Sequence, residues 1–242
     1  MTLRLLLLQA RDPDDPMRQH EHACFVARTG LEPTQIVPLS VLERTPALGE
    51  VVGYDALLMG GSGAYLVSKA NQPRFEPFLD LLRDVVGRRH PIFAACYGFQ
   101  SMVHAMGGSV IHDPDHTEVG TFEITLTEAG ACDPIFSALP ARFLAQQGHK
   151  DRAERLPEGL VNLASSDNCA LQAFRLDDAP VWAVQFHPEL DRDGNRMRYR
   201  HYLESYSPGL SEEELQRELE SFVHSPEASR LLPRFLDVVF DR

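Results

Sequence analysis

Cys96 lies at the kind of position where a nucleophile is expected. Residues 91–95 before it form a short apolar run of the length of a buried strand, and residues 101–106 after it are typical of a helix. Small residues lie near the thiol in the sequence: Ala94 and Ala95 come directly before it, and Gly98 follows two residues after it. A sharp strand-to-helix turn requires small neighbours, and a thiol at a helix N-terminus is favoured as the thiolate. The pattern indicates a catalytic cysteine, with a buried core cysteine as the alternative.

His187 and Glu189 could serve that thiol as base and orienting carboxylate. On a strand, residues i and i+2 point to the same face, and Pro188 between them is expected to end the strand at the edge of the sheet. An imidazole placed there can take the proton of a thiol while the carboxylate holds the ring. The alternative is a polar turn without a chemical role.

Gly60 and Gly61 begin a glycine-rich stretch, residues 60–63, which we expect directly after a strand. Glycines at a strand end allow backbone N–H groups to approach a ligand and stabilise negative charge. With the N–H of Tyr97, they could form an oxyanion hole. A phosphate-binding loop and a plain turn are the alternatives, although neither a Walker A loop nor a dinucleotide fingerprint is present.

The elements expected to position these residues change in character along the chain. The first half alternates apolar strands with helices, which predicts right-handed βαβ units and a mostly parallel sheet. The expected strands there are 3–8, 34–39, 55–59 and 91–95, and the expected helices are 17–28, 75–86 and 101–106. The second half is strand-rich and predicts an antiparallel continuation of the sheet, with strands at 119–127, 142–147, 160–164, 170–176 and 181–186.

The chain is expected to be helical from residue 195 onward. Ser211 and Glu214 form a capping-box pattern, and apolar residues between 215 and 223 share one helical face. A last helix is expected over 232–240. We therefore expect one domain over residues 1–205, with residues 206–242 as a helical extension packed on it.

Composition narrows the class of protein. The 242 residues include 23 Lys and Arg against 35 Asp and Glu, a net charge of −12, which argues against non-specific nucleic-acid binding. Four widely spaced cysteines without a C-x-x-C pair predict neither zinc chemistry nor a disulfide scaffold, and favour a reduced, cytoplasmic protein. No stretch has the length of a membrane span. Residues 112–116, with two histidines and two aspartates, are interpreted as a surface loop rather than a metal site.

Three motifs in order resemble the class I (triad) glutamine amidotransferases, with the closest likeness to the GMP synthase glutaminase domain and its stand-alone relatives. They are Gly60–Gly61, residues 96–100 (CYGFQ) and residues 185–189 (QFHPE). Residues 148–151 (GHKD) are similar to the Ser-His-Gly-Asp segment of that family. The resemblance covers about residues 1–205.

The resemblance implies a flavodoxin-like, three-layer α/β/α fold and a defined chemistry. Cys96 would attack the side-chain amide of glutamine, His187 would move the proton, and Glu189 would orient His187. The family pattern also implies that the N–H groups of Gly61 and Tyr97 hold the oxyanion, and that Gln100 helps to bind glutamine. The products would be glutamate and ammonia, formed through a γ-glutamyl thioester without a cofactor or metal.

Four residues depart from the family pattern. Ala94 replaces a glycine, Ser62 a proline, Gly148 a serine and Lys150 a glycine. None of these positions supplies a catalytic atom, and an alanine at 94 should fit the turn. The replacements at Gly148 and Lys150 are expected to change how the substrate is bound.

Three functions remain open from the sequence. The first is a glutaminase that passes ammonia to an acceptor. Since no Ser-Gly-Gly-x-Asp-Ser ATP-binding loop occurs, either a separate synthase activates that acceptor or no activating machinery exists. In that case we expect the isolated chain to be a poor glutaminase. The second is a γ-glutamyl peptide hydrolase with the same thioester chemistry, and the third is a non-catalytic regulatory module. The sequence does not fix the oligomeric state.

Overall fold

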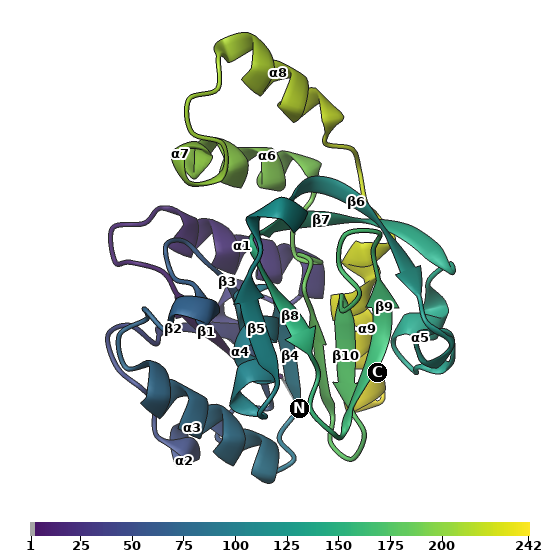
Figure 1. Cartoon of the computed structure of the whole chain (residues 1–242). Coiled ribbons are helices and arrows are strands. Elements are labelled where there is room, and N and C mark those ends of the chain that lie inside the picture. Colours follow the sequence, from purple (N-terminus) through teal and green to yellow (C-terminus); the bar gives the residue numbers. More distant parts are fainter. Residues whose placement is uncertain (1–2) are drawn as a thin grey trace.

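A mixed β-sheet runs through the centre of the protein (Figure 1). The computed structural model describes residues 3–242, and within them the sheet has nine strands in the order β2-β1-β3-β4-β11-β10-β9-β6-β7. The strands β2, β1, β3, β4 and β11 are parallel neighbours. Their bounds are β1 Leu5–Ala10, β2 Ile36–Ser40, β3 Ala56–Ser62, β4 Ile92–Ala95 and β11 Val181–Val184. The βαβ alternation predicted for the first half is confirmed.

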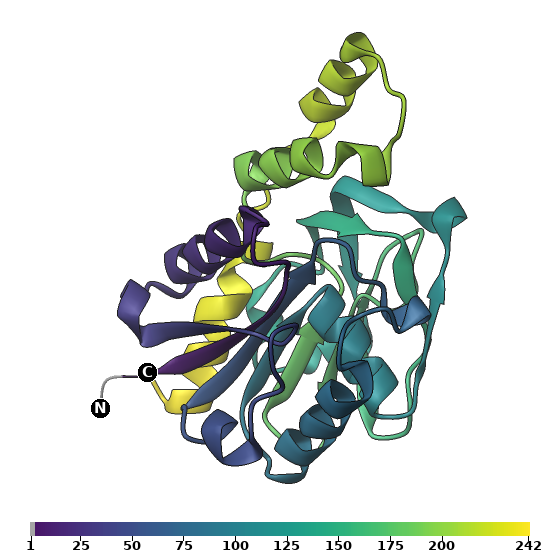
Figure 2. The same cartoon turned by 90° about the vertical axis from the view of Figure 1, so that its left-hand side faces the viewer.

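Helices cover both faces of this parallel part, which makes the expected three layers (Figure 2). Alternate residues of β1 show the division: Leu5 and Leu7 are in the core shared with α1 and α9, whereas Leu6 and Leu8 are in the core shared with α3 and α4. All four leucines are at most 3% exposed. Burying one such side chain contributes about 1.5–3 kcal/mol. The helices are α1 Met17–Thr29, α2 Leu48–Val51, α3 Phe75–Gly87, α4 Tyr97–Ala105 and α9 Leu231–Phe240.

The other half of the sheet is antiparallel, as the second half of the sequence predicts. The four pairings that join β11 to β10, β9, β6 and β7 are all antiparallel, so the sheet as a whole is mixed rather than mostly parallel. The strands are β6 Glu118–Leu126, β7 Arg142–His149, β9 Leu160–Ser165 and β10 Ala173–Leu176, with α5 Glu128–Cys132 after β6. A separate two-stranded sheet, β5 Ser109–His112 with β8 Asp151–Arg155, was not predicted.

Two expectations about the strand ends are wrong. Residues 60–62 do not follow β3 but belong to it, because the pairing with β1 shifts between Leu8↔Met59 and Ala10↔Ser62. This shift inserts one extra residue in β3 at the glycines, as in a β-bulge. The strand β11 ends at Val184, so His187 and Glu189 lie in the turn beyond it and do not share a strand face.

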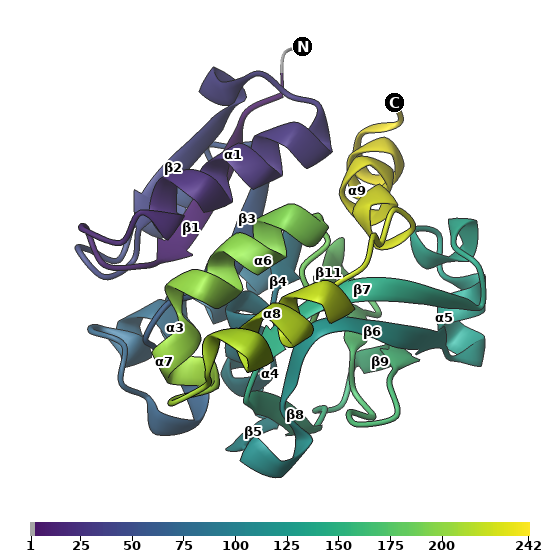
Figure 3. The ribbon, with the colours of Figure 1, turned by 90° about the horizontal axis from the view of Figure 1, so that it is seen from above.

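Helices α6 (Arg192–His201), α7 (Leu203–Tyr206) and α8 (Glu212–Ser221) lie together across one end of the sheet (Figure 3). The predicted capping box of α8 is present, with Ser211 and Glu214 bonded reciprocally. The expected apolar face extends less far than predicted, because α8 ends before Phe222 and Val223 is 43% exposed. None of the helices within residues 3–242 combines the length and the apolar character that crossing a membrane requires.

Candidate active site

Cys96 lies on a strained turn between β4 and α4. Its φ of 51° and ψ of −104° are unusual for a residue other than glycine, a conformation that costs about 1–3 kcal/mol. The N–H of Cys96 donates to Val184 O at 2.8 Å, which anchors the turn to β11. A Cβ at Gly98 would lie 2.7 Å from Met59 Cβ and 3.2 Å from Ala94 Cβ. Because Gly98 has no side chain, there is room beside it for the methyl group of Ala94, which replaces a glycine of the family pattern.

His187 and Glu189 form a buried pair on the adjacent turn. The Nδ1 of His187 lies 2.8 Å from Glu189 Oε1, and the two side chains are at most 6% exposed. A hydrogen bond at Nδ1 leaves Nε2 directed to the other side of the ring. His187 and Cys96 line the same small cavity. The structure thus brings together the three side chains that the sequence marks as candidate nucleophile, base and orienting carboxylate.

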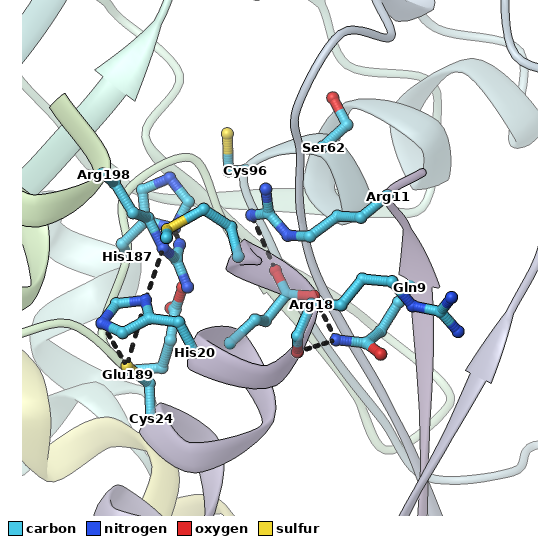
Figure 4. Close-up of polar contacts among 12 residues, drawn as sticks. Gln9, Arg11, Arg18, His20, Cys24, Ser62, Cys96, His187, Glu189 and Arg198 are labelled. Carbon is cyan, nitrogen blue, oxygen red and sulfur yellow. Dashed lines mark hydrogen bonds and ion pairs between the residues drawn. The ribbon is translucent and has the colours of Figure 1, made fainter. Parts of the chain in front are cut away.

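A third buried side chain joins this pair. Arg198 of α6 donates from Nη1 to Glu189 Oε1 at 2.9 Å, and its Nε lies 3.5 Å from His20 Nδ1 of α1 (Figure 4). Arg198 is 5% exposed, so its charge is almost fully removed from water. The carboxylate of Glu189 is therefore balanced by cations on two sides.

The charges in this group shift the pKa values in opposite directions. Burial alone would lower the pKa of His187, but the neighbouring Glu189 carboxylate and Cys96 outweigh it and raise the pKa to about 9. Burial alone would raise the pKa of Glu189, but His187 and Arg198 outweigh it and lower the pKa to about 2. An imidazolium and a carboxylate are thus favoured together over the neutral pH range.

The two glycines of β3 allow other groups to approach closely. A Cβ at Gly61 would lie 3.0 Å from His187 Cε1, and a Cβ at Gly60 would overlap Glu21 Oε1. Glu21 is fully buried and pairs with Arg11 at 3.0 Å. Gly61 therefore adjoins the His187 imidazole, and Gly60 adjoins a buried ion pair that supports the same edge of β3.

Gln100 and Tyr97 lie on α4, one turn apart. The amide nitrogen of Gln100 donates to Asp151 O at 2.8 Å and to Gln185 Oε1 at 3.1 Å. Tyr97 is the first residue of α4, so its N–H lies at the helix N-terminus beside Cys96. Gln100 lines a cavity with Cys96, but it also holds the segment that contains Asp151.

Two small cavities adjoin Cys96, with volumes of about 20 Å³ and 60 Å³. Helix α7 closes both of them. The hydroxyl of Tyr206 donates to Gly148 O at 3.0 Å, and the ammonium of Lys150 donates to Ser205 O at 2.5 Å. Cys96 Sγ is 3.9 Å from the same Gly148 O. Ligand pockets usually measure about 300 Å³ or more, so this arrangement is closed.

Tyr206 also accounts for Gly148, one of the departures from the family pattern. A Cβ at position 148 would lie 3.2 Å from Tyr206 Oη and 3.9 Å from His187 Nε2. A serine there would have to displace the tyrosine hydroxyl. Gly148 and Lys150, the two departures in this segment, thus both contact α7.

A buried network of polar side chains holds residues 148–151 in place. Glu118 of β6 accepts hydrogen bonds from Ser166 at 2.6 Å and from Gln172 at 2.5 Å, and lies 2.9 Å from His149 Nε2. Asp151 accepts from the N–H and the hydroxyl of Ser68, each at 2.9 Å. This segment is therefore rigidly placed beside Cys96.

The remaining candidates from the sequence do not line either cavity beside Cys96. Burial raises the pKa of Cys24 to about 12 and that of Cys169 to about 11, and Cys132 is exposed. In the segment 112–116, His112 contacts Asp151 and His116 contacts Asp113. Within residues 3–242, no three His, Cys, Asp or Glu side chains are grouped to hold a metal ion.

The sequence reasoning missed Arg198, Arg11 and Tyr206. All three line the 20 Å³ cavity, which also contains Cys96 and His187. The available signal was the tyrosine spacing, because Tyr199, Tyr202 and Tyr206 recur at i, i+3 and i+7 and so share one helical face. The sequence does not show that the helix is interrupted between His201 and Leu203, so it does not reveal that these tyrosines are turned toward Cys96.

Comparisons with known proteins agree on one family. The sequence model described as glutamine amidotransferase class-I matches residues 35–203. The glutamine-hydrolyzing GMP synthase of Thermosipho africanus is 40% identical over 100 residues, which are 41% of this chain and 18% of that protein. One subunit of the glutamine-hydrolyzing GMP synthase of Methanothermobacter thermautotrophicus is 29% identical over 165 residues, 66% of this chain and 81% of that protein.

Solved structures share the fold at lower sequence identity. A glutamine amidotransferase from Thermotoga maritima superimposes with a TM-score of 0.69 at 20% identity, over 100% of both chains. The matched region spans about a fifth of two similar synthases from Thermosipho, 18% and 24% of their lengths. The likeness therefore concerns one part of those enzymes.

Proposed function

Because this chain belongs to the class I glutamine amidotransferases, the family whose model matches residues 35–203, we propose that it hydrolyses the side-chain amide of L-glutamine to glutamate and ammonia. Cys96 is the nucleophile, His187 the general base and acid, and Glu189 the residue that orients His187. The observation that carries this proposal is the buried His187–Glu189 pair, with its 2.8 Å contact, in one cavity with a strained Cys96.

These positions support the following reaction. The Cys96 thiolate attacks the amide carbon, and the negative charge that develops on the oxygen is stabilised by the N–H groups of Gly61 and Tyr97. The tetrahedral intermediate collapses, the C–N bond breaks, and His187 gives its proton to the departing ammonia. His187 then takes a proton from water, and the resulting hydroxide attacks the thioester. The C–S bond breaks, which releases glutamate and restores the Cys96 thiolate beside the protonated His187. Gln100 is assigned to the glutamine-binding wall of the cavity.

We further propose that the ammonia is used by a separate synthase. The Methanothermobacter relative is named as one subunit of its synthase, and this chain matches 81% of that subunit's length, which supports the same division of labour here. The closed cavity beside Cys96 also supports a glutaminase that is slow until a partner acts on it. In this arrangement residues 206–242 are an extension that packs back on the amidotransferase domain, with α9 in the layer beside α1.

The test combines turnover with labelling. Purified full-length protein is assayed for glutamate and ammonia release from L-glutamine, with Cys96→Ala as the control, and is treated with a glutamine-like diazo-ketone before peptide mapping. The proposal requires labelling at Cys96 and turnover that depends on it. High kcat/KM on γ-glutamyl peptides, above that on glutamine and without a partner, would replace it with a γ-glutamyl peptide hydrolase. Absence of both turnover and Cys96 labelling would indicate a non-catalytic module.

A further inference from the structure

We propose that Lys150 binds the α-carboxylate of the substrate, and that Ser205 of α7 occupies that position in the closed enzyme. This inference rests on the proposed function and specifies the substrate as an amino acid with a free α-carboxylate. It assigns a specificity role to a lysine that no part of the triad chemistry requires.

Lys150 is the available positive charge in the larger cavity beside Cys96. That cavity is lined by Cys96, Gln100, Lys150 and Asp151, among others. The carboxylate of Asp151 is already engaged, since it accepts two hydrogen bonds from Ser68 and contacts His112 at 2.9 Å. Within the part of the chain that the structure describes, Lys150 forms no ion pair with an acidic side chain. Its ammonium donates instead to a neutral backbone carbonyl, Ser205 O.

The separation along the chain suits an amino-acid substrate. Gly148 O lies 3.9 Å from Cys96 Sγ, and Lys150 is two residues further on. Two residues span at most about 7 Å between their Cα atoms. In extended glutamine, the amide carbon and the carboxylate carbon are separated by four bonds of ~1.5 Å, which places them roughly 5 Å apart. Glutamine is therefore long enough to extend from Cys96 to the segment that carries Lys150, which lines the same cavity.

The contact with Ser205 identifies the kind of group that the lysine binds. A carbonyl oxygen is an acceptor, as is a carboxylate oxygen, but a carboxylate makes the stronger, charge-assisted hydrogen bond. The adjacent Tyr206 hydroxyl donates to Gly148 O at 3.0 Å, so α7 is held to residues 148–150 at two points. Because Ser205 and Lys150 line the same cavity, and that cavity measures only about 60 Å³, a carboxylate can enter beside Lys150 only if the Ser205 carbonyl moves aside and the cavity enlarges.

The decisive experiment compares two substrates that differ only at the α-carboxylate. The wild-type enzyme should have a higher kcat/KM for L-glutamine than for its α-carboxamide, by about 30-fold for a charge-assisted hydrogen bond. Lys150→Met should remove that preference mainly through the KM for glutamine, and Lys150→Arg should keep most of it. Lys69→Met is the control, because it removes the other lysine of the chain, which lies on the exposed turn after Leu66. It should leave the preference for L-glutamine over the α-carboxamide unchanged. A preference unchanged in Lys150→Met would overturn the proposal.

Labelling of Cys96 gives a readout without turnover and separates the two proposals. A diazo-ketone analogue of glutamine carries the α-carboxylate, whereas iodoacetamide carries none. Lys150→Met should slow labelling of Cys96 by the analogue about 30-fold and leave labelling by iodoacetamide within about twofold. If the analogue does not label Cys96 in the wild type, the proposed function fails and this inference fails with it. If it labels wild type and Lys150→Met equally, only the role of Lys150 is wrong.

A further variant tests the competition with α7. Tyr206→Phe removes the bond to Gly148 O and keeps the ring, so it should loosen α7. We expect labelling by the analogue to become about threefold to tenfold faster, as for the loss of one hydrogen bond. The double variant with Lys150→Met should remain insensitive to the carboxylate. If Tyr206→Phe slows labelling instead, Ser205 and the substrate do not compete for Lys150.

Discussion

Arg198 Nη1 lies 2.9 Å from Glu189 Oε1, and the two side chains are at most 6% exposed. The same oxygen accepts the contact from His187 Nδ1 at 2.8 Å. Removing one partner of a buried ion pair leaves the other charge uncompensated, at a cost of about 3–5 kcal/mol. The Glu189 carboxylate is thus held by a cation from α6, outside the three motifs that identify the site.

Replacing Arg198 should therefore affect catalysis through Glu189. In Arg198→Met the pKa of Glu189 should rise, because Arg198 is one of the groups that lower it. Since the orienting group must be ionised, the acid limb of the kcat/KM profile should move to higher pH, and kcat should fall about tenfold or more. Arg200→Met, on an exposed position of the same helix, is the control. An unchanged acid limb would mean that Arg198 has a structural role only.

Protein stability should depend on pH through His187. Its pKa in the folded state, about 9, is above the reference value of 6.5, so its contribution is complete below pH 6.5 and is lost as pH rises through 9. The stability difference between wild type and His187→Gln should decrease by on the order of 3 kcal/mol between pH 6 and pH 9.5. Denaturant unfolding at the two pH values measures it, with exposed His224→Gln as the control. A difference that does not vary with pH contradicts the raised pKa.

The three residues of the proposed triad should not be equally important. Cys96→Ala and His187→Ala should each reduce kcat by on the order of 10⁶-fold, and Glu189→Ala by on the order of 10⁴-fold, as in other triads. The smaller loss is expected because an orienting group acts only through the imidazole. Single-turnover assays of glutamate release measure all three, and Glu220→Ala on α8 is the control. Full activity in Glu189→Ala would remove its assignment.

The four cysteines should differ in reactivity. Burial raises the pKa of Cys24 and Cys169 to about 12 and 11, so neither should react at neutral pH. Exposed Cys132 should react with iodoacetamide but not with the glutamine-like diazo-ketone, which requires the binding cavity. Only Cys96 should be modified by the diazo-ketone. Peptide mapping after limited reaction checks this, and equal modification of Cys132 by the diazo-ketone would argue against a binding cavity at Cys96.

Gly61 should tolerate no side chain. In Gly61→Ala the new Cβ would lie 3.0 Å from His187 Cε1 and 3.5 Å from Arg11 Nη2, so the imidazole must move. We expect kcat to fall at least tenfold and stability to fall by about 1–3 kcal/mol. Gly87→Ala in α3 meets no atom within 4 Å and should instead stabilise the protein by about 0.5–1 kcal/mol. Normal kcat in Gly61→Ala would show that the imidazole can be displaced without loss.

The sequence by itself determined the family, the α/β class and the positions of most strands along the chain. These follow from local patterns: apolar runs of strand length, helical periodicity, and small residues around Cys96. The pairing of His187 with Glu189 was also predicted, but for the wrong reason. The two residues meet because of the turn beyond Val184, where hydrogen bonding and burial set the geometry, and not because of strand alternation.

Only the tertiary structure decided what surrounds Cys96. Arg198, Arg11 and Tyr206 converge on it from α6, from the end of β1 and from α7. Such contacts depend on how α6 and α7 lie across the sheet, and a pattern within one helix does not encode that placement. The tertiary structure also set the pKa values, because the effects of burial and neighbouring charge on His187 and Glu189 oppose each other and their balance depends on distance.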